Sequence, residues 1–397
     1  MKTNRSSFAT VSIPLLLLPR RSKIAWLSLG LCGLALTTSA LAQSITMSAM
    51  STFSPNGDGW LSVTEDSFLT DGSTNETQRG LAFNPTNNHL YITTRTGTTA
   101  TVGAKIFDAS TGVGLGNLNV TGIQFGSAGV LNGIGVTSDG FIYAANASQV
   151  ANGSNPYKLY RWSSESSAPS QVNFAAGGLD AFRLGDNFDL IGSDTDGTTQ
   201  IVAGYNGGTG YTIVSPSLLS STLVSTGAAN AFRGGVAFVD GSTVWGTLGP
   251  GTAISRSKTD GSLLGTSSLQ DSVERQIDIV NVNGTWLMAS VEAAHNTTNA
   301  CDVRVYDITN SVNNGTGAIT LLSTMNLVPA PYKDNINTGG AITFGAVTGN
   351  DVTLYAMSTN NGVQAFNIHV TPVPEPATAA LLAGGLSLLA VRRRRAR

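Results

Sequence analysis

The chain has 397 residues, of which 41% are hydrophobic, only 12% are charged and 46 are glycine. This composition excludes a disordered chain and a long coiled coil and, since the glycines follow no three-residue period, collagen. Ten of the 22 basic residues lie in the two terminal segments, so residues 43–391 hold 12 basic against 24 acidic residues, a net charge of −12 that argues against a nucleic-acid partner.

The first segment, residues 1–42, is expected to be a secretory signal peptide. Five basic residues accompany an apolar run from Ile24 to Leu36, and Ala40 and Ala42 occupy the small-residue positions that a signal peptidase reads. A helix over that run is roughly 20 Å long, which is short of the roughly 30 Å hydrocarbon core. These features predict export through the Sec translocon and cleavage before Gln43, with an uncleaved membrane anchor as the alternative.

The central segment, residues 43–372, is expected to form one all-β domain. Between residues 60 and 370 no amphipathic helical pattern occurs, and short apolar runs alternate with Gly, Asn, Asp, Ser and Thr. Six segments repeat the same order: an inner strand, a polar turn, a second strand often containing Tyr or Trp, a third strand and sometimes a fourth. The inner strands are expected to begin at Leu81, Ile134, Phe188, Val236, Ile277 and Ile342.

Units of this size with four short strands are typical of β-propeller blades, so the sequence predicts a propeller of about six blades. The sixth unit lacks a fourth strand, and the run from Trp60 to Val63, upstream of the first unit, is the candidate to supply it. Pairing the N-terminal strand with the last unit would close the ring and leave no open edge. A β-sandwich shares these strand and turn patterns and is the alternative architecture.

Arginine recurs just before four of the expected inner strands. In a propeller these positions would lie at one mouth of the central channel, where guanidinium groups can bind an anionic sugar or a carboxylate. The alternative is a structural role, in which each arginine pairs with Asp180, Asp186, Glu274 or Asp278 or with backbone carbonyls. The four positions are Arg79, Arg183, Arg233 and Arg275.

Two loops have the oxygen-rich, glycine-containing sequence typical of calcium sites. One contains Asp194 and Asp196, and the other is Asn-Gly-Asp-Gly at residues 56–59. Neither has the twelve-residue ligand spacing with a terminal glutamate, and ordinary Asp-Gly turn chemistry explains both. Calcium therefore remains a candidate cofactor, and no other is indicated. Once the signal is removed Cys301 is the only cysteine, so no intrachain disulfide is expected.

The last segment, residues 373–397, combines three features in a fixed order. The motif Val373-Pro374-Glu375-Pro376 is followed by fifteen uncharged residues and then by an arginine-rich end. The two prolines favour an extended, exposed backbone. The apolar stretch can enter a membrane as a helix, and the arginine cluster would stay on its cytoplasmic side.

This three-part tail closely resembles the PEP-CTERM sorting signal of Gram-negative bacteria. The resemblance implies that exosortase, a membrane-embedded cysteine transpeptidase, recognises the motif, removes the tail and passes the protein to the cell exterior. The body, with RGLAFNPTNNHLY at residues 79–91, resembles a propeller-like domain of unknown function found in such proteins. That second resemblance implies a fold and a location and no activity.

We therefore expect an exported cell-surface or extracellular-matrix protein that acts as a binding or scaffold module, with exopolysaccharide as a partner implied by the resemblance. A propeller enzyme acting on sugars or lactones around a central divalent metal is the alternative. Its ligands would come from inner strands, where Asp186, Asn187, Asp189 and Asp278 are available. No motif assigns a catalytic residue, since neither a GxSxG elbow nor a histidine-rich metal pattern occurs.

Overall fold

A computed structural model describes residues 43–69, 78–94, 103–124, 129–148, 156–174, 182–249, 251–293, 296–315 and 317–371. Residues 43–372 form one compact unit. The expected signal peptide, with Ala40 and Ala42, and the sorting motif at residues 373–376 lie outside the described residues. No helix among the described residues is long and apolar enough to cross a membrane.

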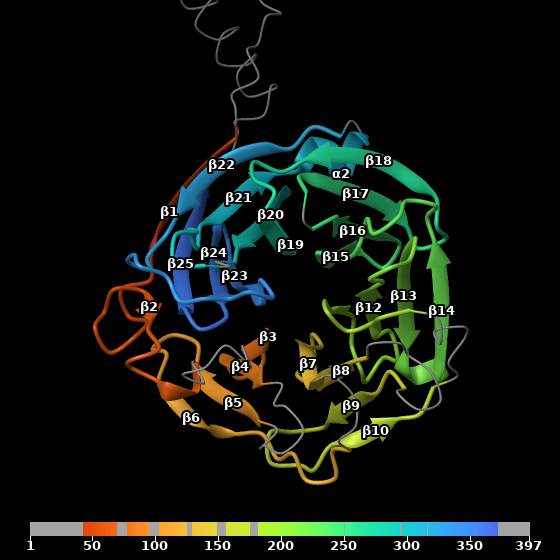
Figure 1. The fold of residues 1–397 in the computed structure, drawn as a ribbon, viewed down its shortest axis with the longest axis horizontal. Helices are drawn as coiled ribbons and strands as arrows, with labels where there is room; N and C mark the ends of the chain where they lie inside the picture. Colours follow the sequence, from red (N-terminus) through yellow and green to blue (C-terminus); the bar gives the residue numbers. More distant parts are fainter. Residues whose placement is uncertain are drawn as a thin grey trace, which may run out of the picture. The chain divides into compact units, whose positions relative to one another are not determined.

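The body is a six-bladed β-propeller, as the sequence predicts, with six antiparallel sheets arranged in a ring (Figure 1). The first three blades are β3 (Gln78–Asn84), β4 (His89–Thr94), β5 (Gly103–Asp108) and β6 (Gly114–Asn117); β7 (Gly129–Val136), β8 (Ile142–Ala147), β9 (Leu159–Trp162) and β10 (Ser170–Val172); and β11 (Asp189–Ile191), β12 (Gln200–Gly204), β13 (Gly210–Ser215) and β14 (Ser220–Ser225).

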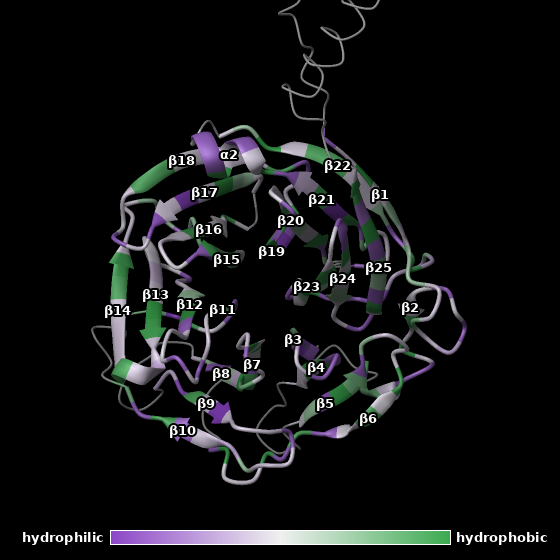
Figure 2. Cartoon of the chain, turned by 180° about the vertical axis from the view of Figure 1, so that it is seen from behind, coloured by the Kyte–Doolittle hydropathy of each residue, from purple (hydrophilic) through white to green (hydrophobic). Residues whose placement is uncertain are grey.

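The remaining blades complete the ring, and the six inner strands lie nearest its centre in the front and rear views (Figures 1 and 2). They are β15 (Gly235–Asp240), β16 (Thr243–Thr247), β17 (Ala253–Lys258) and β18 (Leu263–Ser268); β19 (Glu274–Val282), β20 (Thr285–Glu292), β21 (Val303–Asp307) and β22 (Thr320–Met325); and β23 (Gly340–Thr348), β24 (Asp351–Ser358) and β25 (Gly362–Thr371) with β1 (Ser44–Ala49) and β2 (Trp60–Leu61).

Tight polar turns join neighbouring strands of a blade. Between β19 and β20, Val282 pairs with Thr285, which leaves Asn283 and Gly284 as a two-residue loop. Both residues have positive φ, 49° and 91°, as a type I′ hairpin turn requires. The Asn-Gly pair therefore fixes the register of this hairpin.

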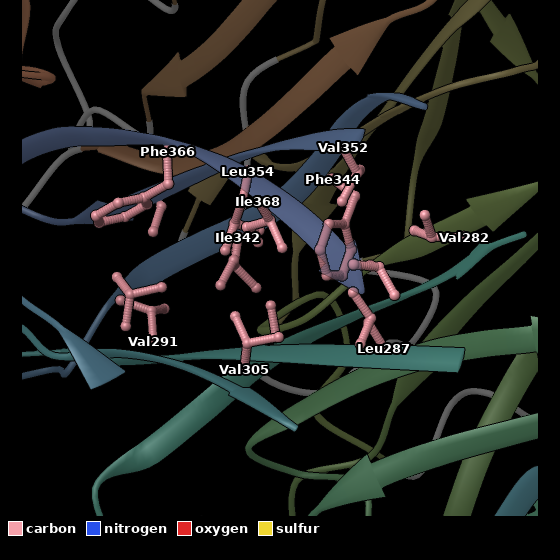
Figure 3. Close-up of a cluster of buried hydrophobic side chains, with 14 residues drawn as sticks. Val282, Leu287, Val291, Val305, Ile342, Phe344, Val352, Leu354, Phe366 and Ile368 are labelled. Atoms are coloured by element: carbon pink, nitrogen blue, oxygen red, sulfur yellow. The ribbon is translucent and has the colours of Figure 1, made fainter. Parts of the chain in front are cut away.

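The hydrophobic core lies between neighbouring blades. Figure 3 shows the contact between blades 5 and 6, where aliphatic side chains of β20 and β21 face those of β23, β24 and β25. Leu287 and Val305 from blade 5 and Leu354 and Phe366 from blade 6 are fully buried there. Burial of such side chains stabilises each by roughly 1.5–3 kcal/mol, so each blade depends on its neighbours.

Tyrosines on the second or third strand of a blade add polar links from one blade to the next. The hydroxyl of Tyr91 donates to Glu165 of blade 2 at 2.6 Å, and Tyr143 donates to Asp194 of blade 3. Tyr211 donates to the Lys258 carbonyl of blade 4, and Tyr355 of blade 6 donates to the Ala109 carbonyl of blade 1. The last of these contacts spans the junction between the two ends of the propeller.

The ring is closed by the N-terminal part of the chain, as predicted, but the closing strand differs in part from the expected one. The run Trp60–Leu61 does pair with β25, opposite Gln364 and Val363. The longer pairing is made by β1, whose six residues pair with β25 from Thr371 to Phe366. The sequence analysis missed β1, whose residues alternate between exposed and half-buried and include no large aromatic side chain.

Candidate functional site

The four arginines predicted to share a channel mouth do line one cavity. This cavity, the arginine basin, has a volume of about 320 Å³ and is lined by Arg79, Arg183, Arg233 and Arg275. The arginines come from blades 1, 3, 4 and 5, and each lies at or just before the start of its inner strand. Because inner strands run along the channel, equivalent positions in different blades meet at the same end of it.

The channel continues beneath the basin as two further chambers. A narrow chamber of about 50 Å³ shares Arg79, Asn132, Asp186 and Gln276 with the basin. It opens in turn towards a third chamber of about 320 Å³, with which it shares apolar inner-strand residues. We call the third chamber the aspartate vestibule, because Asp189 and Asp278 are the only charged residues among the described residues that line it.

The arginines have different surroundings. Arg183 forms two short hydrogen bonds to Asp186, from Nε at 2.6 Å and from Nη2 at 2.7 Å, which is the pairing that the structural alternative expected. Arg79 is 9% exposed and lies against Gly339, where the Cβ of any other residue would fall 1.9 Å from Nη1. Asp180 lies outside the described residues.

The expected pairing does not extend to Arg275. Glu274 instead lies against Arg304, and Asp278 lies in the aspartate vestibule. No ion pair from Arg233 or Arg275 to a described carboxylate is present. Burial, followed by the positive charge of Arg233, lowers the pKa of Arg275 from its ordinary value. The basin thus holds excess positive charge.

Amides and a loop that the sequence analysis did not single out complete the basin. Asn132 and Gln276 line it, as does the loop Ile336–Gly340. Asn187 acts beside it as a clamp: its Nδ2 donates to the carbonyls of Phe232 and Arg233 at 3.0 Å each, and its Oδ1 accepts from the amide of Gly204. This clamp fixes the backbone that carries Arg233. Gln276 directly follows Arg275 in the chain, which is a signal that could have identified it. Asn132 lies in β7 of blade 2, which has no arginine, so no sequence signal marks it.

The aspartate vestibule places two carboxyl groups in mainly apolar surroundings. Asp189 accepts from the amides of Leu190 and Phe238, and Asp278 accepts from those of Ile279 and Phe344. Burial first, and the negative charge of Asp278 second, raise the pKa of Asp189 to about 8. Burial raises the pKa of Asp278 to about 6. The backbone donors oppose these shifts without cancelling them.

This pair predicts a pH dependence of stability. A carboxyl group whose folded-state pKa is raised binds more protons when folded than when unfolded, so its stabilising effect is full below about pH 4 and is lost as the pH rises through the folded pKa. The urea concentration at the midpoint of unfolding should therefore decrease as the pH is raised from about 5 to about 8. Asp189→Asn should make stability depend less on pH, while Asp240→Asn, at the exposed end of β15, should leave the pH dependence unchanged. Equal slopes in the two variants would contradict the assignment.

The candidate metal ligands do not gather at one site: Asp189 and Asp278 share the vestibule, but no third His, Cys, Asp or Glu among the described residues joins them. Asp194 is held by Arg161, whose Nε and Nη2 lie 2.7 and 2.6 Å from its two carboxylate oxygens, and Asp196 is an exposed turn residue. In the Asn-Gly-Asp-Gly loop, Asp58 accepts from Ser54 and from the amide of Trp60. Asp186 lines the basin and Asp189 the vestibule. Within the described ranges no group of three or more His, Cys, Asp or Glu side chains could hold a metal ion.

The fold and its axial chambers define a six-bladed propeller with a cationic channel mouth. In fold the chain is similar to a DUF4623 family protein from Bacteroides eggerthii, with a TM-score of 0.56 and 16% identity over 83% of this chain and 76% of that one. A PQQ-bound aldose sugar dehydrogenase from Streptomyces coelicolor gives a TM-score of 0.46 at 15% identity, covering 83% and 99%. No protein-family model matches the chain, and no curated protein does.

Proposed function

We propose that the protein is an exported binding module of the cell surface or extracellular matrix, and that the arginine basin is its ligand site for an anion. The observation that carries the binding role is the gathering of four arginines around one cavity, two of them without a carboxylate partner among the described residues. A guanidinium group presents paired donors that match a carboxylate, so such a cavity favours an anionic ligand. Acidic exopolysaccharide is the partner that fits both the charge and the location.

Export and sorting rest on the sequence. The segment before Gln43 has the pattern of a cleaved signal, and the motif Val373-Pro374-Glu375-Pro376 stands before an apolar stretch and an arginine cluster. Exosortase would remove the tail after translocation. A strain without exosortase should therefore retain the chain at the inner membrane with its C-terminal tail uncut, and Glu375→Ala should do the same in the parent strain. Cytosolic protein of full length in both strains would contradict export.

The binding role has its own test. Matrix fractions from cells that express the wild-type chain should retain it, whereas Arg233→Met/Arg275→Met should release it into the medium. Arg161→Met removes an arginine that pairs with Asp194 outside the basin and should leave retention unchanged. Metal analysis of the purified chain distinguishes the binding module from the enzymatic alternative. A tightly held stoichiometric divalent ion would favour a metal-dependent propeller enzyme.

A further inference from the structure

Two arginines of the basin have no carboxylate partner in the described part of the chain. Among the residues that the structure describes, the side chains of Arg233 and Arg275 form no ion pair, and the buried Nε of Arg275 has no hydrogen-bond acceptor. The positive charge of Arg233 contributes to lowering the pKa of Arg275, so the two guanidinium groups lie close enough to repel each other. An anion bound between them would offset that repulsion and accept from both.

Two acceptors beside these donors also lack a partner. The side chain of Asn132 is 5% exposed, and its Oδ1 has no donor within the described part of the chain; the same holds for the buried Oε1 of Gln276. The orientation of the Asn132 amide is fixed, because its Nδ2 donates to the carbonyl of Gly185. The unpartnered atom is therefore an oxygen, which requires a donor.

Both amides also line the narrow chamber of about 50 Å³ beneath the basin. A group that reaches them must be small and must donate a hydrogen bond, as a hydroxyl does. A simple anion such as sulfate or acetate satisfies the arginines and leaves Asn132 and Gln276 without a donor. A neutral sugar satisfies the amides and leaves the two cations unneutralised.

We propose that the arginine basin binds a hydroxylated carboxylate of the sugar-acid class, with the carboxylate between Arg233 and Arg275 and a hydroxyl directed to Asn132 and Gln276. This inference rests on the anion-binding role proposed above and narrows its ligand. Asp186 at the same cavity, paired with Arg183, adds a carboxylate that disfavours highly charged anions such as polyphosphates.

The size and position of the basin limit the ligand to a single sugar residue. Its volume of about 320 Å³ lies at the lower end of the range for small-molecule sites. The cavity is lined by residues at or near the starts of inner strands of several blades, and Figure 1 shows these inner strands around the centre of the ring. A free sugar acid or the terminal residue of an acidic polysaccharide can enter along this axis. An internal sugar residue of a polysaccharide cannot, because the sugar residues on both sides of it would clash with the walls of the cavity.

The test is calorimetric titration of the full-length chain, purified in mild detergent, with glucuronate, glucose, acetate and sulfate. Glucuronate should bind at least tenfold more tightly than each of the other three. Arg275→Met should weaken glucuronate at least tenfold, and Gln276→Met should weaken glucuronate severalfold while leaving acetate unchanged. Arg161→Met, the arginine control outside the basin, should bind glucuronate like the wild type.

The outcomes separate this inference from the proposed function. Equal affinities for acetate and glucuronate, both lost in Arg275→Met, would overturn the sugar-acid assignment and leave the anion site intact. If the substitutions of Arg275 and Arg233 left the affinity for every anion unchanged, both the sugar-acid assignment and the anion-binding role of the basin would be overturned. If a melting curve shows that Arg275→Met does not fold, Arg233→Met is tested in its place. The sugar-acid assignment then depends only on whether the wild-type chain binds glucuronate more tightly than glucose, acetate and sulfate.

Discussion

Arg304→Met is expected to lower the free energy of unfolding by about 3–5 kcal/mol at neutral pH, because it leaves buried carboxylates without a counter-charge. Arg304 is 7% exposed and lies in blade 5. Its Nη1 is 2.9 Å from Glu292 and 3.6 Å from Glu274, and its Nη2 is 3.1 Å from Asp302. Glu274 is fully buried and also accepts from Tyr306 and Ser290. Urea unfolding measures the loss.

The control for this prediction is Arg161→Met, which breaks a partly exposed pair with Asp194 and should cost about 1 kcal/mol. The deficit of Arg304→Met should shrink in acid, because protonation removes the unpaired charge of Glu292, whose pKa is raised by burial. The double variant Glu292→Gln/Arg304→Met should recover part of the loss. A cost no larger than that of Arg161→Met would show that the network does not hold blade 5 together.

Much of the propeller could be predicted because its regularities are local. Each inner strand is a short apolar run that ends in a polar turn, and such runs recur once per blade. The outer strands of blades are harder to predict from the sequence, because they are exposed and show little alternation of apolar and polar residues. In blade 1 the outer strand β6 is Gly114–Asn117, whose four residues are all exposed, so no apolar run marks it in the sequence. The buried Leu118 follows that strand.

The arginine basin could be predicted from the sequence only in outline. The recurrence of arginine before inner strands predicts four guanidinium groups at one channel mouth, and in the structure the four arginines line one cavity. The pairing of Arg183 with Asp186, three residues further on, could be expected from spacing. That Arg233 and Arg275 have no carboxylate partner among the described residues depends on side chains distant in the sequence, which no spacing reports. The same limit applies to Asp186 and Asp189: they are three residues apart, yet the inner strand carries them to different chambers.

The double variant Ile45→Lys/Met47→Lys is expected to lower the free energy of unfolding by about 2–4 kcal/mol and to promote self-association. Ile45 and Met47 are the half-buried residues of β1 that pack on the core shared by blades 5 and 6. Two lysines there would remove apolar contact and place charge against buried side chains. Detachment of β1 would then expose the edge of β25 from Phe366 to Thr371 to pairing with other chains.

The matched control is Thr46→Lys/Ser48→Lys, which adds the same charge to the same strand on its exposed face. Those two residues pair with His369 and Asn367 in the backbone ladder but face away from the core, so stability and oligomeric state should stay close to those of the wild type. Urea unfolding and light scattering of both variants measure the two effects. Equal behaviour of the two pairs would mean that β1 is dispensable and that Trp60–Leu61 closes the ring alone. A loss confined to the inward-facing pair means that the first strand of the body holds the last blade in place, and therefore that the arginine basin depends on residues at both ends of the propeller.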